Sequence, residues 1–158
     1  MIRPIVPADT PALVALSASS GLFKPDELDA IQWMLDVYHT TNAANGHNII
    51  AYEEGGTLVG IAYFAPKVFT DRVWELLMIA VDESRHRQGI GSSLLVTVED
   101  AVRALDGRLL LIETSDKSSF ERTRLFYRKH GYVEVAHIPD YFADGDGKAS
   151  FIKRVLMK

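Results

Sequence analysis

The chain of 158 residues contains no cysteine. Without thiols it cannot form a disulfide, a thiolate metal site or a cysteine nucleophile. It also lacks any uninterrupted apolar run near the roughly 18 residues that span a membrane, and its start, MIRPIVPADTPALVAL, lacks the long apolar segment of a signal peptide. From these absences we expect a cytoplasmic protein that does not enter a membrane.

An excess of positive charge is missing as well. The chain has 17 Lys and Arg against 21 Asp and Glu, and its formal net charge is −4. A weakly acidic protein lacks the basic surface that nucleic acids require, so we expect no nucleic-acid partner. The five histidines show no ligand spacing, which predicts no metal site. The length and the 47% of apolar residues predict a single folded domain over residues 1–158.

Apolar periodicity and turn residues predict a mixed α/β fold. Strands are expected at residues 2–6, 48–53, 57–65, 73–81, 108–114, 132–138 and 149–156, and helices at residues 10–19, 25–39, 91–105 and 121–130. The segment TTNAANGHN is expected to be a polar loop, and Leu125 and Phe126 are expected to face inward. The order β-α-α-β-β-β-α-β-α-β-β describes a mixed sheet, antiparallel early and late, with helical crossovers in the middle.

The segment RHRQGIGSSLL has the composition of an anion site. Backbone N–H groups at a helix start attract anions, and the helix dipole adds partial positive charge. Gly89 and Gly91 permit close approach, while Arg85 and Arg87 add full charge. A diphosphate fits this pattern; the alternative is a turn with solvated arginines. A P-loop would need a Lys-Ser/Thr pair that is missing, and a dinucleotide fingerprint would need glycine where Leu94 stands.

The longer segment IAVDESRHRQGIGSSLL strongly resembles the acetyl-CoA-binding motif of the GNAT superfamily of N-acetyltransferases. A second segment, RLFYRKHGYVEV, resembles the family's helix that ends in a tyrosine followed by Gly-Phe/Tyr. The predicted order of elements also matches the family fold, so the resemblance spans nearly the whole chain. It implies a GNAT-like acyl-CoA N-acyltransferase fold.

Carried over by position, the resemblance implies an acetyl-CoA site in this chain. Backbone of Ile79 and Val81 should pair with the pantetheine arm, and amides from Arg87 to Ser92 should hold the diphosphate. The implied binding residues are Ile79, Ala80, Val81, His86, Arg87, Gln88, Gly89, Ile90, Gly91, Ser92 and Tyr127.

Two positions depart from the family pattern. His86 stands where the family has Arg or Gln, which predicts a weaker and pH-dependent side-chain contribution. Phe120 stands where many members have asparagine, so the usual hydrogen bond to the cofactor arm would have to come from Ser118 or Ser119, or be absent.

Two residues are candidates for the chemistry. An alkyl amine has a pKa of about 10.4, so a base must remove its proton before it attacks a thioester. Glu75 is the only charged residue in the apolar run VWELLMIAV, and burial would raise its pKa. Some family members use a glutamate at this position as the base; the alternative is a salt-bridged structural residue. Tyr127, at the family's tyrosine, would be the acid for the coenzyme A thiolate; the alternative is a packed aromatic.

The sequence therefore predicts an N-acetyltransferase that moves an acetyl group from acetyl-CoA to a primary amine. The absence of cysteine excludes an acyl-cysteine intermediate and favours direct transfer in a ternary complex. A small amine is the expected acceptor; a protein N-terminus or lysine, or a non-catalytic acyl-CoA sensor, are the alternatives. Residues 20–47 and 137–148, where acceptor specificity is expected, carry no motif, and a homodimer is also expected.

Overall fold

The computed structural model describes residues 1–156, which form the predicted order of strands and helices. The strands are β1 (Ile2–Pro4), β2 (Asn48–Glu54), β3 (Thr57–Pro66), β4 (Val73–Val81), β5 (Leu109–Ser115), β6 (Val133–Ala143) and β7 (Asp146–Arg154). The helices are α1 (Thr10–Ser19), α2 (Leu28–Val37), α3 (Ile90–Ala104) and α4 (Glu121–Lys129). Within the described residues, no helix is long and apolar enough to cross a membrane.

The strands are hydrogen-bonded in the order β1-β2-β3-β4-β5-β7-β6, so the sheet is mixed and β4 is its middle strand. β4 pairs with β5 in parallel, whereas β1–β2, β2–β3, β5–β7 and β6–β7 are antiparallel. The prediction of a central strand at residues 73–81 is confirmed. The chain forms two compact units, the first from residues 1–66 and 77–100 and the second from residues 67–76 and 101 onward.

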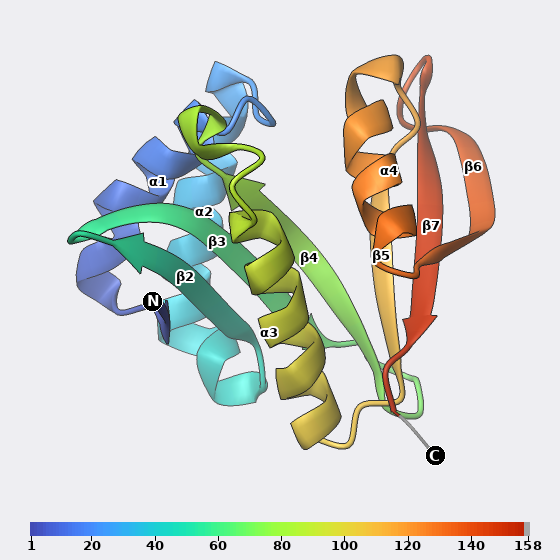
Figure 1. The fold of residues 1–158 in the computed structure, drawn as a ribbon, viewed down its shortest axis with the longest axis horizontal. Helices are drawn as coiled ribbons and strands as arrows, with labels where there is room; N and C mark the ends of the chain where they lie inside the picture. The colour runs from blue at the N-terminus through green and yellow to red at the C-terminus, as the bar shows by residue number, and fades with distance from the viewer. Residues whose placement is uncertain (157–158) are drawn as a thin grey trace. The chain divides into compact units, whose positions relative to one another are not determined.

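In the first unit, helices cover both faces of the strands. Figure 1 shows α1 and α2 behind β2 and β3, and α3 in front of them. Leu13, Leu35, Ile49 and Ile61 are fully buried in one cluster between the helix pair and the strands. Burying such side chains contributes about 1.5–3 kcal/mol each, so this cluster is a main source of the unit's stability.

The contact between β3 and α3 is unusually close at Gly60. A Cβ atom there would lie 2.8 Å from Leu94 Cδ1 and 3.1 Å from Ile90 Cγ2. Only a residue without a side chain lets the first turns of α3 approach β3 this closely. Gly60 therefore determines where α3 begins relative to the strands of the first unit.

The polar segment TTNAANGHN does not form the predicted loop. Residues 38–42 form a π-helical turn that continues α2, and Ala43–Asn45 form a 3₁₀ turn. Thr40 Oγ1 donates to the carbonyl of Asp36 at 2.9 Å, and Asn45 Nδ2 donates to that of Thr41 at 3.1 Å. Polar side chains that bond to nearby carbonyls keep the chain wound, and Gly46, with φ of 88°, ends the winding.

In the second unit, α4 packs against the strands through Tyr127. Its ring lies 6.1 Å from those of Phe151 on β7 and Tyr132 beyond the helix. The prediction that Leu125 faces inward is wrong, because this side chain is 53% exposed. Residues two apart on a helix are separated by about 200°, so burying Tyr127 turns Leu125 to the solvent. Phe126 is half-buried.

Candidate functional site

The first unit contains the whole predicted acetyl-CoA segment. Ile79, Ala80 and Val81 end β4, and the remaining predicted binding residues of the segment, residues 86–92, follow as a loop and the first turn of α3. The other two predicted residues, Glu75 and Tyr127, belong to the second unit.

The loop from Asp82 to Gly89 is held in shape by its own polar side chains. The Asp82 carboxylate accepts hydrogen bonds from the Ser84 backbone N–H at 2.9 Å and from the Ser84 hydroxyl at 2.8 Å. His86 Nε2 lies 2.9 Å from the carbonyl oxygen of Val81. The His86 side chain is therefore engaged with the backbone at the end of β4, where the family has a longer Arg or Gln.

The end of this loop has the geometry of an anion site. Arg87 and Gly89 adopt left-handed conformations, with φ of 65° and 80°. The Ser93 amide donates to the Gly89 carbonyl at 3.0 Å, so the amides of Ile90 and Gly91 precede the intrahelical hydrogen bonds. A Cβ atom at Gly89 would have no other heavy atom within 4 Å, so the space beside it is open. Amides and open space together suit a phosphate group.

Arg85 has two side-chain partners within the first unit. Its guanidinium forms an ion pair with Glu54 at the end of β2, and its Nε donates to Gln88 Oε1 at 3.0 Å. Glu54 therefore balances the positive charge that the sequence suggested for a phosphate, and Arg85 fixes Gln88 instead. No sequence signal links Glu54 to this loop, because the pairing depends on how the hairpin of β2 and β3 folds.

In the second unit, Glu75 lies in a partly buried, charged environment. Its side chain is 14% exposed, and Oε1 lies 3.3 Å from the ammonium nitrogen of Lys67. Burial raises the pKa of Glu75 above its ordinary value, and the Lys67 ammonium opposes this rise. The pKa direction predicted from the sequence is confirmed, together with the ion pair that was the alternative interpretation.

A second carboxylate, Glu113, was missed by the sequence analysis. It is on β5, where it pairs with Ser150 of β7. The Glu113 Oε2 atom accepts from Lys148 Nζ at 2.7 Å and from Ser150 Oγ at 3.1 Å. Burial raises the pKa of Glu113, but these two donors outweigh that effect and hold it below its ordinary value. The sequence did contain an indication of this residue, because Glu113 is the only acidic residue in β5.

Tyr127 is almost completely buried among aromatic rings. Its relative exposure is 4%, and burial raises the pKa of its hydroxyl well above the usual range. The phenol therefore stays protonated at neutral pH, where it can donate a hydrogen bond but does not readily ionise. Ser118 and Ser119, the suggested substitutes for the family's asparagine, lie in a 3₁₀ turn just before α4.

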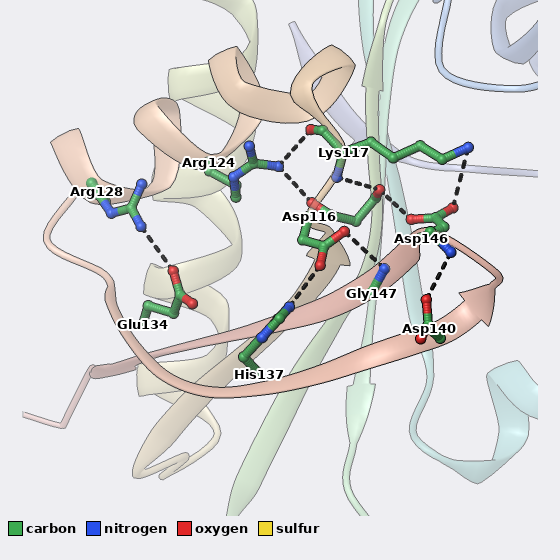
Figure 2. A network of polar contacts seen from close by, with 11 residues as sticks. Asp116, Lys117, Arg124, Arg128, Glu134, His137, Asp140, Asp146 and Gly147 are labelled. Atoms are coloured by element: carbon green, nitrogen blue, oxygen red, sulfur yellow. Dashed lines mark hydrogen bonds and ion pairs between the residues drawn. The ribbon is translucent and has the colours of Figure 1, made fainter.

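A polar network fixes the junction between β5 and α4. Figure 2 shows Asp116 between His137 and Gly147, with bonds of 2.6 Å to His137 Nε2 and 2.8 Å from the Gly147 amide. Arg124 of α4 donates to the carbonyls of Ser115 and Lys117 at 2.7 and 2.9 Å. These bonds attach α4, and with it Tyr127, to the hairpin of β6 and β7.

Comparisons with known proteins agree with this description. The family model for the acetyltransferase (GNAT) domain matches residues 44–134. A solved structure described as a GNAT-family acetyltransferase, from Desulfovibrio desulfuricans, has 31% sequence identity and a TM-score of 0.92, covering 98% of both chains. No curated protein sequence matches significantly.

Two more distant structures show the same fold. An aminoglycoside 6'-N-acetyltransferase complexed with coenzyme A has 19% identity and a TM-score of 0.82, covering 100% of this chain and 98% of its own. The ribosomal-protein-S18-alanine N-acetyltransferase from Escherichia coli has 18% identity and a TM-score of 0.77, covering 100% and 95%. The chain therefore belongs to the GNAT family, and it is an acetyltransferase enzyme.

Proposed function

We propose that the protein transfers an acetyl group from acetyl-CoA to a small primary amine, directly within a ternary complex. The observation that carries this proposal is the left-handed Gly89 at the start of α3, with open space beside it and the Ile90 and Gly91 amides ahead of the first intrahelical bond. The family's shared chemistry and a neighbour complexed with coenzyme A support acetyl-CoA as the donor.

The proposed binding residues act mainly through their backbone. The amides from Arg87 to Ser92 would hold the diphosphate, because donors at a helix start point to one spot and the helix dipole favours negative charge. The backbone of Ile79 and Val81 would bind the pantetheine arm as an added strand. Only Arg87 would then add full positive charge within the loop, since Glu54 balances Arg85.

Glu75 would accept the proton of the acceptor amine. At neutral pH an alkyl amine is almost wholly protonated, so a base is needed before its nitrogen can attack the thioester carbon. Burial raises the pKa of Glu75 toward the working range, which makes its carboxylate a stronger base than an exposed one. Its proton acceptance would proceed directly or through a water molecule.

Tyr127 would donate to the thiolate of coenzyme A as that group leaves. The carbon–sulfur bond breaks as the new carbon–nitrogen bond is completed, and the sulfur needs a proton or a strong hydrogen bond at that moment. Because its pKa is raised by burial, the Tyr127 hydroxyl still carries its proton at any pH suited to the reaction.

A small amine is one of two candidate acceptors. The structural neighbours include an aminoglycoside 6'-N-acetyltransferase and a ribosomal-protein-S18-alanine N-acetyltransferase, so the fold by itself fits both small-molecule and protein acceptors. The expected cytoplasmic location, single domain and homodimer also stay predictions.

The proposal is tested by screening acceptors for release of free thiol from acetyl-CoA. Small amines, including aminoglycosides and polyamines, are compared with peptides that carry a free N-terminus or a lysine. We expect turnover with a small amine, intersecting initial-rate plots and a large loss of rate in Glu75→Gln. Parallel plots would contradict direct transfer, and turnover with peptides alone would contradict the small acceptor.

A further inference from the structure

Glu75 has a second carboxylate beside it that the proposed mechanism does not use. β4 and β5 are parallel, and Glu75 pairs with Leu111. Glu113 lies two residues further along β5, so its side chain is on the same face as that of Leu111, one step from Glu75. Two acidic side chains are thus adjacent on one face of neighbouring strands.

The surroundings of Glu113 hold it in the charged form. Lys148 Nζ lies 2.7 Å from its Oε2 atom, and the Ser150 hydroxyl donates to the same oxygen at 3.1 Å. Lys148 is itself held in place, because its ammonium lies 3.9 Å from the centre of the Tyr141 ring. Its side chain is only 13% exposed. Such a short, shielded ion pair keeps a negative charge at Glu113.

This fixed charge acts on Glu75. A carboxylate that loses its proton next to another carboxylate meets like charge, so it holds its proton more strongly and is a stronger base. The groups that face this pair in the second unit are Lys67, Lys148 and Tyr141, besides the hydroxyl of Ser150. Lys67 contacts Glu75 and opposes the effect of Glu113, whereas Lys148 contacts Glu113.

We propose that Glu113 is a positioning residue for acetyl transfer, whose negative charge keeps Glu75 a strong proton acceptor. The proposal rests on the function proposed above, because it matters to the reaction only if Glu75 is the base. Glu113 itself need not touch either substrate. Lys148 moderates the effect, since its positive charge partly balances that of Glu113.

The test measures the titration of Glu75 in the purified protein without any substrate. Glutamate labelled with ¹³C at the side-chain carboxyl gives one NMR signal per residue, and Glu75→Gln identifies the signal of Glu75. We expect Glu113→Gln to lower the pKa of Glu75 by about one unit, because a neighbouring charge is removed. Lys148→Met should shift the higher apparent pKa of the coupled pair upward. The control, Glu134→Gln, removes an exposed carboxylate on β6 and should change neither value.

If Glu113 and Lys148 only maintained the fold, Glu113→Gln and Lys148→Met would not shift the measured pKa in opposite directions. If Glu113→Gln leaves the pKa of Glu75 unchanged or raises it, the proposal is wrong. If Glu113→Gln does not fold, Lys148→Met still tests the proposal, because an unchanged or lowered upper apparent pKa in that variant would contradict it. Activity then separates the two proposals, because full turnover in Glu75→Gln would contradict the role of Glu75 even where the titration shows the predicted shifts. With an acceptor at hand, the acidic limb of kcat/KM should move in the same directions.

Discussion

Gly60 of β3 lies so close to Leu94 of α3 that a methyl group on Gly60 would come within 2.8 Å of Leu94 Cδ1. Leu94 is fully buried, so its side chain can shift only by displacing its neighbours in the core. We therefore expect Gly60→Ala to lower the free energy of unfolding by about 1–3 kcal/mol, as overpacking does in well-packed cores. Urea denaturation followed by circular dichroism measures this change.

Leu94→Ala provides the control for this contact. On its own it should cost about 2–5 kcal/mol, because it leaves a cavity. The double variant Gly60→Ala/Leu94→Ala should lose less free energy of unfolding than the two single variants lose together. The methyl group added at Gly60 fills part of the space that the leucine leaves. Strict additivity would show that the two residues do not compete for the same volume.

Tyr127→Phe removes one buried hydroxyl and keeps the aromatic packing on Phe151. If the hydroxyl donates to the leaving thiolate, kcat should fall roughly 100-fold, within the range for a general acid. Affinity for coenzyme A should change little, which calorimetry can verify. Tyr52→Phe on β2 is the matched control and should keep full activity. An unchanged kcat in Tyr127→Phe would show that Tyr127 acts only as a packed aromatic side chain.

The contact of Asp116 with His137 predicts a dependence of stability on pH. The hydrogen bond from His137, followed by that from the Gly147 amide, holds the pKa of Asp116 below its ordinary value. A carboxyl group whose pKa is depressed on folding contributes stability above its unfolded pKa, near 3.9, and loses it as pH falls through the folded value. Asp116→Asn should therefore be less stable than the parent at pH 7, with a smaller difference near pH 2. A difference independent of pH, measured by thermal unfolding, would contradict this.

Much of the fold could be predicted because hydrophobic periodicity and turn residues agree with the tertiary structure. The run VWELLMIAV could hardly form anything but a central strand, and the predicted bounds of α1 are those observed. The segment after α2 could not be predicted in this way. Its polar residues resemble a loop, but the side chains of Thr40 and Asn45 bond to their own backbone and keep the chain helical.

The conformation of the candidate site was predictable where the local sequence determines the backbone, and its side-chain contacts were not predictable where distant strands meet. Gly89 has a left-handed backbone conformation that favours glycine, so the residue type itself indicates this conformation in the sequence. Glu54 pairs with Arg85, which is 31 positions away in the sequence. Glu113 pairs with Lys148, which is 35 positions away. Only strand pairing and register bring such residues together, and charged residues of this kind look alike in a sequence whether paired or solvated.

The most direct test of the whole account is calorimetry of coenzyme A binding to Gly89→Glu. A carboxylate at this position would occupy the open space next to the amides and repel a diphosphate, so the affinity should fall at least tenfold. Gly56→Glu is the matched control, because Gly56 has nearly the same φ, 81° against 80°, and equally open surroundings in the turn between β2 and β3. We predict tight binding to the parent and to Gly56→Glu and weak binding to Gly89→Glu. Absence of binding to the parent, or equal binding to all three, would contradict the account.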